Sequence, residues 1–255
     1  MKSALITGGA RGIGFATARD LVSTGWQVAL LDRDSEALAV ALAELPGAIG
    51  IDADVSTPAD VDRAVQEVTQ AFGGLDGLVN NAGVADFGPI RETTFERWQR
   101  VMQTNLDGPF LMTQAFTEML AADGGGAVVN ITSISGLRAS TLRVAYGTSK
   151  AALAQLTLQQ AAELGELGIR VNAVAPGSVA TKLAMAVHSP EIIAAYHDAL
   201  PLNRYGKEEE IAAAIVFLLS DKASFITGQI LAADGGFEAV GIGLPALRTS
   251  SAEVE

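Results

Sequence analysis

The sequence contains no cysteine and only two histidines, His188 and His197. Without cysteine the chain cannot form disulfides, use a thiolate nucleophile or bind a metal through sulfur. The two histidines lie nine residues apart, in a segment without carboxylates spaced for metal ligation. We therefore expect no metal site, and exposed or substrate-lining positions for both imidazoles.

Basic residues are also few: 17 lysines and arginines stand against 29 acidic residues, which gives a formal charge of −12. This charge repels phosphate backbones and anionic membranes, so we expect no nucleic-acid or membrane partner. No apolar run reaches the roughly 18 residues that a membrane span needs. Met1 leads within a few residues into the first predicted strand, which leaves no room for a signal peptide. These features predict a cytoplasmic protein.

The chain is instead rich in short apolar segments, with 49% hydrophobic residues among 255. Predicted strands cover residues 2–7, 27–31, 48–51, 75–79, 127–131, 169–173 and 229–232, and predicted helices cover 16–22, 35–45, 58–72, 94–120, 146–164 and 207–219. This alternation predicts one α/β domain, residues 1–237, with a parallel sheet covered by helices on both faces. Residues 179–203 fit neither pattern and are predicted to form a substrate lid. Residues 238–255 are predicted to be a C-terminal tail.

A glycine-rich turn follows the first predicted strand, with glycines at positions 8, 12 and 14. Gly8 suits the tight turn, Gly12 lets the backbone approach a pyrophosphate, and Gly14 lets the helix pack on the strand. The positive end of the following helix then faces the phosphate charge. Taken alone, such glycines can also serve a purely conformational purpose.

Asp32, at the end of the second predicted strand, lies about twenty residues beyond this turn. A carboxylate at this place can accept hydrogen bonds from both hydroxyls of an adenosine ribose, which favours NAD. It would repel the 2′-phosphate of NADP. Arg11 and Arg33 are nearby in the sequence and either of them can neutralise a 2′-phosphate, so NADP stays possible.

Two further polar segments come directly after strands. Asp54 and Val55 follow the third predicted strand, and Asn81, Ala82 and Gly83 follow the fourth. Open parallel sheets bind ligands at the carboxyl ends of their strands, so we expect both segments to contact the cofactor. Asn-Gly clusters also make simple turns.

Tyr146 and Lys150 are four residues apart, and Ser133 precedes the tyrosine by thirteen. On a helix the two side chains share one face, so the ammonium can act on the phenol. We predict that it lowers the pKa of Tyr146, which then serves as general acid/base. Ser133 is predicted to hold the substrate oxygen through its hydroxyl.

Asn105 lies four residues before Pro109, inside the long predicted helix 94–120. Because proline has no N–H, the Asn105 carbonyl loses its usual helical donor, and we expect a local helix defect there. The freed carbonyl can hold a water. A simple kink at Gly108 and Pro109 is an equally good interpretation.

These motifs, in this order and spacing, resemble the classical short-chain dehydrogenase/reductase family from about Lys2 to Phe237. The resemblance implies a single doubly wound Rossmann-type domain with a seven-stranded sheet, and a catalytic tetrad of Asn105, Ser133, Tyr146 and Lys150. It further implies a water relay at Asn105 and a homotetramer formed through the two helices poorest in charge, within 103–117 and 151–162. The predicted cofactor contacts are Gly8, Arg11, Gly12, Ile13, Gly14, Asp32, Arg33, Asp54, Val55, Asn81, Ala82, Gly83, Tyr146, Lys150, Pro176, Gly177, Val179 and Thr181.

The function that follows is hydride transfer between NAD and a secondary alcohol or ketone. An NADPH-preferring 3-oxoacyl thioester reductase is the alternative within the same chemistry, and a non-catalytic nucleotide-binding module is the alternative outside it. Arg138 and Arg143 flank the approach to Tyr146. They can bind an anionic substrate or simply be surface charges.

Overall fold

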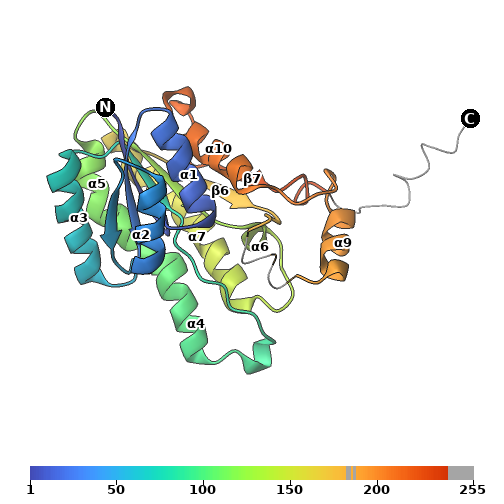
Figure 1. Ribbon diagram of the computed structural model, residues 1–255. Coiled ribbons are helices and arrows are strands. Elements are labelled where there is room, and N and C mark those ends of the chain that lie inside the picture. The colour runs from blue at the N-terminus through green and yellow to red at the C-terminus, as the bar shows by residue number, and fades with distance from the viewer. Residues whose placement is uncertain (182–184, 186–187, 241–255) are drawn as a thin grey trace, which may run out of the picture.

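The computed structural model describes residues 1–181, 185 and 188–240. Its centre is a seven-stranded sheet in which every neighbouring pair is parallel, in the order β3-β2-β1-β4-β5-β6-β7 (Figure 1). The strands are β1 (Ser3–Thr7), β2 (Gln27–Asp32), β3 (Ile49–Asp52), β4 (Gly77–Asn80), β5 (Ala127–Ile131), β6 (Arg170–Pro176) and β7 (Ile230–Ala233). The predicted doubly wound Rossmann-type fold is confirmed.

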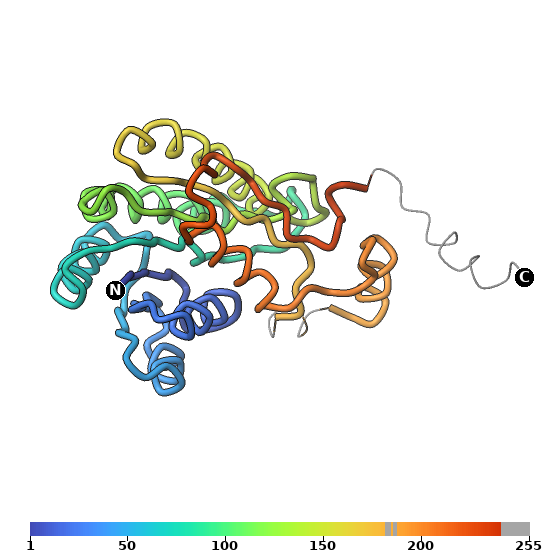
Figure 2. Tube along the Cα trace, turned by 90° about the horizontal axis from the view of Figure 1, so that it is seen from above, coloured from blue at the N-terminus to red at the C-terminus, as the bar shows by residue number. Residues whose placement is uncertain are grey.

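Helices cover both faces of this sheet. One face carries α1 (Gly12–Ser23), α2 (Ser35–Glu44) and α10 (Glu208–Leu219), and the other carries α3 (Pro58–Phe72), α5 (Gly108–Ala121) and α7 (Val144–Leu164). Figure 2 shows α1 and α2 on one side of the molecule and α5 and α7 on the opposite side. Right-handed crossovers place helices on both faces because the strand order runs from β1 to β3 in one direction and from β4 to β7 in the other.

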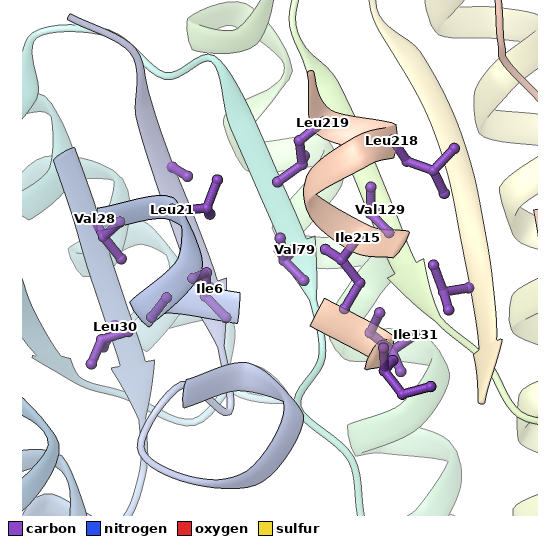
Figure 3. Close-up of a cluster of buried hydrophobic side chains, with 14 of the residues drawn as sticks. Ile6, Leu21, Val28, Leu30, Val79, Val129, Ile131, Ile215, Leu218 and Leu219 are labelled. Carbon is purple, nitrogen blue, oxygen red and sulfur yellow. The ribbon is translucent and has the colours of Figure 1, made fainter. Parts of the chain in front are cut away.

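Adjacent residues of β1 and of β2 belong to two different hydrophobic cores, one on each face of the sheet. Ile6 and Leu30 pack under α1 and α10, while Leu5 and Leu31 face α3 and α5. Alternation along a strand causes this division, and it explains why these strands are apolar without interruption. Figure 3 shows the first of the two cores, where side chains of β1, β2, β4 and β5 meet those of α1 and α10.

The predicted long helix 94–120 is interrupted in the structure. It consists of α4 (Phe95–Met102), the π-helix η2 (Gln103–Asp107) and α5. The N–H of Gly108 bonds to the carbonyl of Gln103, five residues earlier, which is the π pattern. The helix defect expected at Asn105 is thus confirmed, and it is a widened turn rather than a simple proline kink.

Several elements lie outside the regular alternation. They are the short helices η1 (Ile90–Glu92), α6 (Ile134–Leu137), η3 (Gly165–Leu167) and η4 (Asp221–Ala223), and the helix α9 (Pro190–Ala199). The last of these falls in the segment 179–203 that we predicted as a lid. Residues 182–184, 186–187 and 241–255 of the predicted lid and tail lie outside the described residues. Among those described, no helix has both the length and the apolar character to cross a membrane.

Candidate active site

A cavity of about 1130 Å³ lies beside the glycine turn. Residues from the ends of β1, β2, β3 and β4 line it, at the edge where parallel sheets bind ligands. Of the predicted cofactor residues, the lining includes Gly8, Arg11, Gly12, Ile13, Asp32, Arg33, Asp54, Val55, Asn81, Ala82, Gly83 and Thr181. It does not include Gly14, Tyr146, Lys150, Pro176, Gly177 and Val179.

Two glycines of the turn are required by close packing. A Cβ atom on Gly14 would lie 2.3 Å from the carbonyl oxygen of Gly8, and one on Gly8 would lie 2.8 Å from the Cα of Ala82. Gly8 also has a φ of +60°, which disfavours a side chain. The turn can therefore keep this shape only with glycine at both positions, and its backbone faces the cavity directly.

Hydrogen bonds of Thr7 connect this turn to the residues that follow β4. Its hydroxyl oxygen accepts hydrogen bonds from the N–H groups of Asn81 and Ala82, both at 3.0 Å. The Asn81 side chain donates to the carbonyls of Thr7 and Gly8, at 3.0 and 2.9 Å. These bonds fix two predicted cofactor-binding segments relative to one another.

Asp32 lies at the end of β2 with both carboxylate oxygens engaged. One accepts from the N–H of Ala10 at 3.2 Å and the other from the N–H of Asp34 at 3.1 Å. Its side chain therefore has a fixed place in the wall of the cavity. A carboxylate accepting only two such bonds keeps lone pairs for further donors.

Both arginines near Asp32 are paired with carboxylates. Arg33 forms an ion pair with Asp54 at 3.2 Å, and Arg11 forms one with Asp34. The Ala37 N–H and the Arg11 guanidinium hold the pKa of Asp34 below its ordinary value. This end of the cavity thus combines three carboxylates with two arginines that are already neutralised.

Lys150 lies on α7 one turn after Tyr146 and is only 3% exposed. Its Nζ donates to the carbonyl of Ile131 at 2.7 Å and lies 5.9 Å from the centre of the Tyr146 ring. Ser133, two residues beyond β5 at the N-cap of α6, lies close enough to Tyr146 for its hydroxyl to lower the pKa of the phenol. The helix and the strand end thus bring together the serine, tyrosine and lysine singled out in the sequence.

Asn105, on the π-helix, is fully buried and reaches two other segments. Its amide group exchanges two hydrogen bonds with the backbone of Val84, at 2.8 and 2.9 Å, and donates to the Ser149 hydroxyl at 3.0 Å. Gly83 lies between the proposed groups, because a Cβ there would be 3.3 Å from Asn105 Oδ1 and 3.5 Å from Lys150 Nζ. The fourth predicted residue therefore lies near Lys150 and bonds to the helix that carries Tyr146.

The segment after β6 is held against β7. The Gly177 N–H donates to the Ala233 carbonyl at 3.0 Å, and a Cβ on Gly177 would come within 2.6 Å of the Asp234 Cα. Pro176 ends β6, and Val179 is 7% exposed and bridges to Gly206. These three residues shape the chain that leads to Thr181, which itself lines the cavity.

Comparisons with known proteins relate the chain to dehydrogenases and reductases. A family model described as "Enoyl-(Acyl carrier protein) reductase" matches residues 8–238. The chain is 40% identical to 2-(S)-hydroxypropyl-CoM dehydrogenase 3 of Xanthobacter autotrophicus, over 92% of this chain and 96% of that protein. It is 41% identical to galactitol 2-dehydrogenase (L-tagatose-forming) of Cereibacter sphaeroides, over 92% and 94%. The crystal structure of levodione reductase superposes with a TM-score of 0.89 at 34% identity, over 94% of this chain and 98% of that one.

The chain belongs to the short-chain dehydrogenase/reductase family. It is an oxidoreductase that acts on CH–OH groups and the corresponding carbonyls with a nicotinamide nucleotide. The relatives named above act on different alcohols, so the family does not by itself define the substrate.

The residues of this short-chain dehydrogenase/reductase fit a dinucleotide. The turn at Gly8 presents bare backbone to the cavity, the first turn of α1 begins there, and Asp32, bonded to Ala10 of the turn, lies in the cavity wall. Such a helix start attracts phosphate, and such a carboxylate binds ribose hydroxyls. Among the described residues, no cluster of His, Asp or Glu has the composition of a metal site.

The electrostatics of Tyr146 correct one prediction. Burial raises the pKa of Tyr146, and the opposing effects of the Ser133 hydroxyl and the Arg143 charge do not cancel this, so the pKa is above its ordinary value of 10.0. We predicted a lowered pKa, which is wrong in direction. Burial also lowers the pKa of Lys150 from 10.5 to about 8, so its ammonium is itself destabilised and is a weaker influence than spacing alone suggests.

We predicted no role for Ser149 from the sequence, and we named His188 without its contacts. Ser149 links Asn105 to the active helix, since its hydroxyl donates to the Tyr146 carbonyl at 2.7 Å. His188 contacts two tyrosines: its Nδ1 lies 3.0 Å from the Tyr205 hydroxyl, and its ring stacks on Tyr196 at 5.5 Å. A polar residue three positions after Tyr146 is the one available signal for Ser149. No sequence pattern predicts that His188 contacts Tyr196 and Tyr205.

Proposed function

We propose that this enzyme is an NAD-dependent dehydrogenase of secondary alcohols, which reduces the corresponding ketones in reverse, with Tyr146 as general acid/base. The observation that carries the proposal is the grouping of Ser133, Tyr146 and a buried Lys150 at the carboxyl edge of the sheet. Burying a lysine costs stability, so a lysine kept there is better explained by chemistry than by packing.

Each residue has a distinct task in this proposal. During oxidation Tyr146 acts in its phenolate form, whose oxygen accepts the proton of the substrate hydroxyl, and during reduction the neutral phenol donates its proton to the carbonyl oxygen. Ser133 donates a hydrogen bond to that same oxygen, where negative charge develops. Lys150 supplies positive charge beside the phenol, and Asn105 holds α7 in place through Ser149. When bound, the nicotinamide supplies the acceptor or donor of the hydride.

The predicted cofactor residues that line the cavity hold the nucleotide in this proposal, and the arrangement around Asp32 supports NAD. A 2′-phosphate would enter a wall that carries Asp32, Asp34 and Asp54, while Arg11 and Arg33 are engaged by the latter two. Repulsion between a phosphate and a nearby carboxylate costs on the order of a few kcal/mol, or a discrimination of ~100-fold. The alternative, an NADPH-preferring 3-oxoacyl thioester reductase, requires this repulsion to be overcome.

We further propose that the enzyme is a homotetramer and that residues 179–203 cover the substrate. Phe110 on α5 and Leu158 on α7 are 46% and 40% exposed, which supports a partner surface on these helices.

The proposal that residues 179–203 cover the substrate is supported by Thr181, which lines the cavity, and by His188, which contacts Tyr205. A cytoplasmic location is part of the same proposal.

Initial rates of nicotinamide reduction test this function. The purified protein is given NAD or NADP with a panel of secondary alcohols, which includes hydroxypropyl-CoM and galactitol, and a 3-oxoacyl thioester is tested with NADH and NADPH. The proposal predicts turnover of at least one alcohol with a clear preference for NAD. Turnover of the thioester alone, with NADPH, would replace it by the alternative.

A further inference from the structure

Arg143 lies beside the proposed catalytic tyrosine. Its Cζ is 6.0 Å from the centre of the Tyr146 ring and 4.9 Å from that of Phe87. Its charge lowers the pKa values of both Tyr146 and His188, against the larger effect of burial at Tyr146 and together with burial at His188. The guanidinium is therefore close enough to the phenol and to His188, in the segment that we propose as the lid, for its charge to act on both.

The guanidinium has no carboxylate partner in the part of the chain that the structure describes. Its side-chain hydrogen bond is to a neutral group, the Ser135 hydroxyl, at 3.4 Å. Arg138, the other arginine on this approach, is instead paired with Glu238 at 2.8 Å. A half-buried guanidinium without a counter-charge is an unusual state in a protein with 29 acidic residues.

The backbone holds Arg143 in this place at some cost. Leu142, just before it, has a φ of +62°, in the left-handed region that a leucine rarely adopts. Its carbonyl accepts the N–H of Gly88 at 3.0 Å, and Arg143 and Gly88 form a parallel bridge. Backbone strain of this kind is typically retained at functional positions.

We propose that Arg143 binds an anionic group of the substrate, so that the enzyme acts on secondary alcohols or ketones that carry a compact oxyanion, a carboxylate or sulfonate, a few bonds from the reacting carbon. This proposal rests on the proposed function, because it places the anion relative to Tyr146. A guanidinium presents a planar set of donors that fits such an anion with two parallel hydrogen bonds. Phe87 and Tyr146 flank the guanidinium and partly exclude water, which strengthens the pairing.

Matched substrates test the proposal. 3-Hydroxybutyrate and 3-hydroxybutyramide have the same shape and differ in charge, and 2-hydroxypropane-1-sulfonate presents the other oxyanion. We expect either anion to exceed the amide in kcat/KM by more than about tenfold, and Arg143→Gln to lower that ratio by roughly 10- to 100-fold. Arg143→Lys should keep part of the ratio, since it retains the charge without the planar fork.

Arg138→Gln is the matched control, because it removes an arginine from the same approach that already has a partner. We expect its anion-to-amide ratio to equal that of the unchanged protein. Equal rates for anion and amide, or a ratio unaffected by Arg143→Gln, would overturn the proposal. We compare the anion-to-amide ratio of kcat/KM because Arg143 also lowers the pKa of Tyr146. That effect changes the rates of both substrates equally and therefore cancels in the ratio.

A measurement without turnover separates this proposal from the catalytic one. The chain has two histidines, so the NMR titration of His188 can be assigned with a single His197→Gln variant. Unreactive butyrate, bound at Arg143, should offset its charge and raise the pKa of His188, whereas butyramide should not. An Arg143-dependent rise, with NADH present or absent, supports the anion site even if no alcohol is oxidised. No such rise in either condition would refute it.

Discussion

The side chain of Asn105 donates a hydrogen bond to the Ser149 hydroxyl at 3.0 Å, and so joins the π-helix to the helix that carries Tyr146. The Ser149 hydroxyl in turn donates a hydrogen bond to the Tyr146 carbonyl at 2.7 Å. The widened turn is what positions Asn105 between β4 and α7, because its amide also bonds to Val84. A helix irregularity thus orients the catalytic helix.

Replacing Asn105 by alanine should weaken both folding and catalysis. The change leaves two backbone groups of Val84 and the Ser149 hydroxyl without their buried partner, and we expect a loss of about 2 to 4 kcal/mol in the free energy of unfolding. Urea unfolding measures it. Gln103→Ala, on the exposed side of the same π-helix, is the control and should change stability by less than about 0.5 kcal/mol. Equal effects of the two substitutions would contradict the account.

Lys150→Met should change how stability depends on pH. Between pH 8 and 10.5 the folded protein has released the Lys150 proton that the unfolded chain still holds. The unfolded state then binds more protons, so this lysine makes stability rise with pH across that interval, by at most about 3 kcal/mol at 1.36 kcal/mol per unit. Below about pH 8 both states are protonated and the penalty of burial is constant. The free energy of unfolding of the native protein, relative to that of Lys150→Met, should therefore be higher at pH 10 than at pH 7. A difference independent of pH would argue against a buried ammonium.

Asp32→Asn should relax the choice of cofactor. It removes the charge nearest to the predicted ribose site while keeping the side chain's shape, and we expect the kcat/KM ratio of NADP to NAD to rise by roughly 10- to 100-fold. Asp123→Asn makes the same change of charge in the exposed turn before β5 and should leave the ratio unaltered. If Asp32→Asn weakens both cofactors equally, the carboxylate does not discriminate between them.

Leu158→Glu should disrupt the proposed tetramer. Leu158 is 40% exposed on α7, and a charge there would lose its hydration in a helix–helix interface, at a cost of several kcal/mol. Light scattering at micromolar concentration should show a smaller species than the native protein. A native protein that is already monomeric would exclude this assembly.

The sheet and its flanking helices were predictable because short apolar runs alternate with helical periodicity along the whole chain. The helix α9 was missed, although Ser189 caps it and Pro190 opens it, because its ten residues include no long apolar stripe. The four residues of α6 are too few to show any period. The apolar periodicity of the sequence predicts the long helices, whereas short capped helices depend on tertiary contacts.

The candidate site was predictable in its residues but not in its electrostatics. Spacing placed Tyr146 and Lys150 on one helix face, but the pKa of each depends on burial, which comes from segments far away in the sequence. The pairing of Arg138 with Glu238, one hundred residues later, likewise has no local signal. That pairing is what distinguishes the two arginines at the approach to the site.

If Tyr146 transfers the substrate proton, Tyr146→Phe removes the group that carries it. With the alcohol that the native enzyme oxidises best, we expect the rate of NADH formation in the variant to fall by about 10²- to 10⁴-fold, while the circular dichroism spectrum is unchanged. Tyr205→Phe, which removes a hydroxyl that contacts His188, should retain the chemistry. A Tyr146→Phe enzyme that keeps its rate within a few fold would contradict the account.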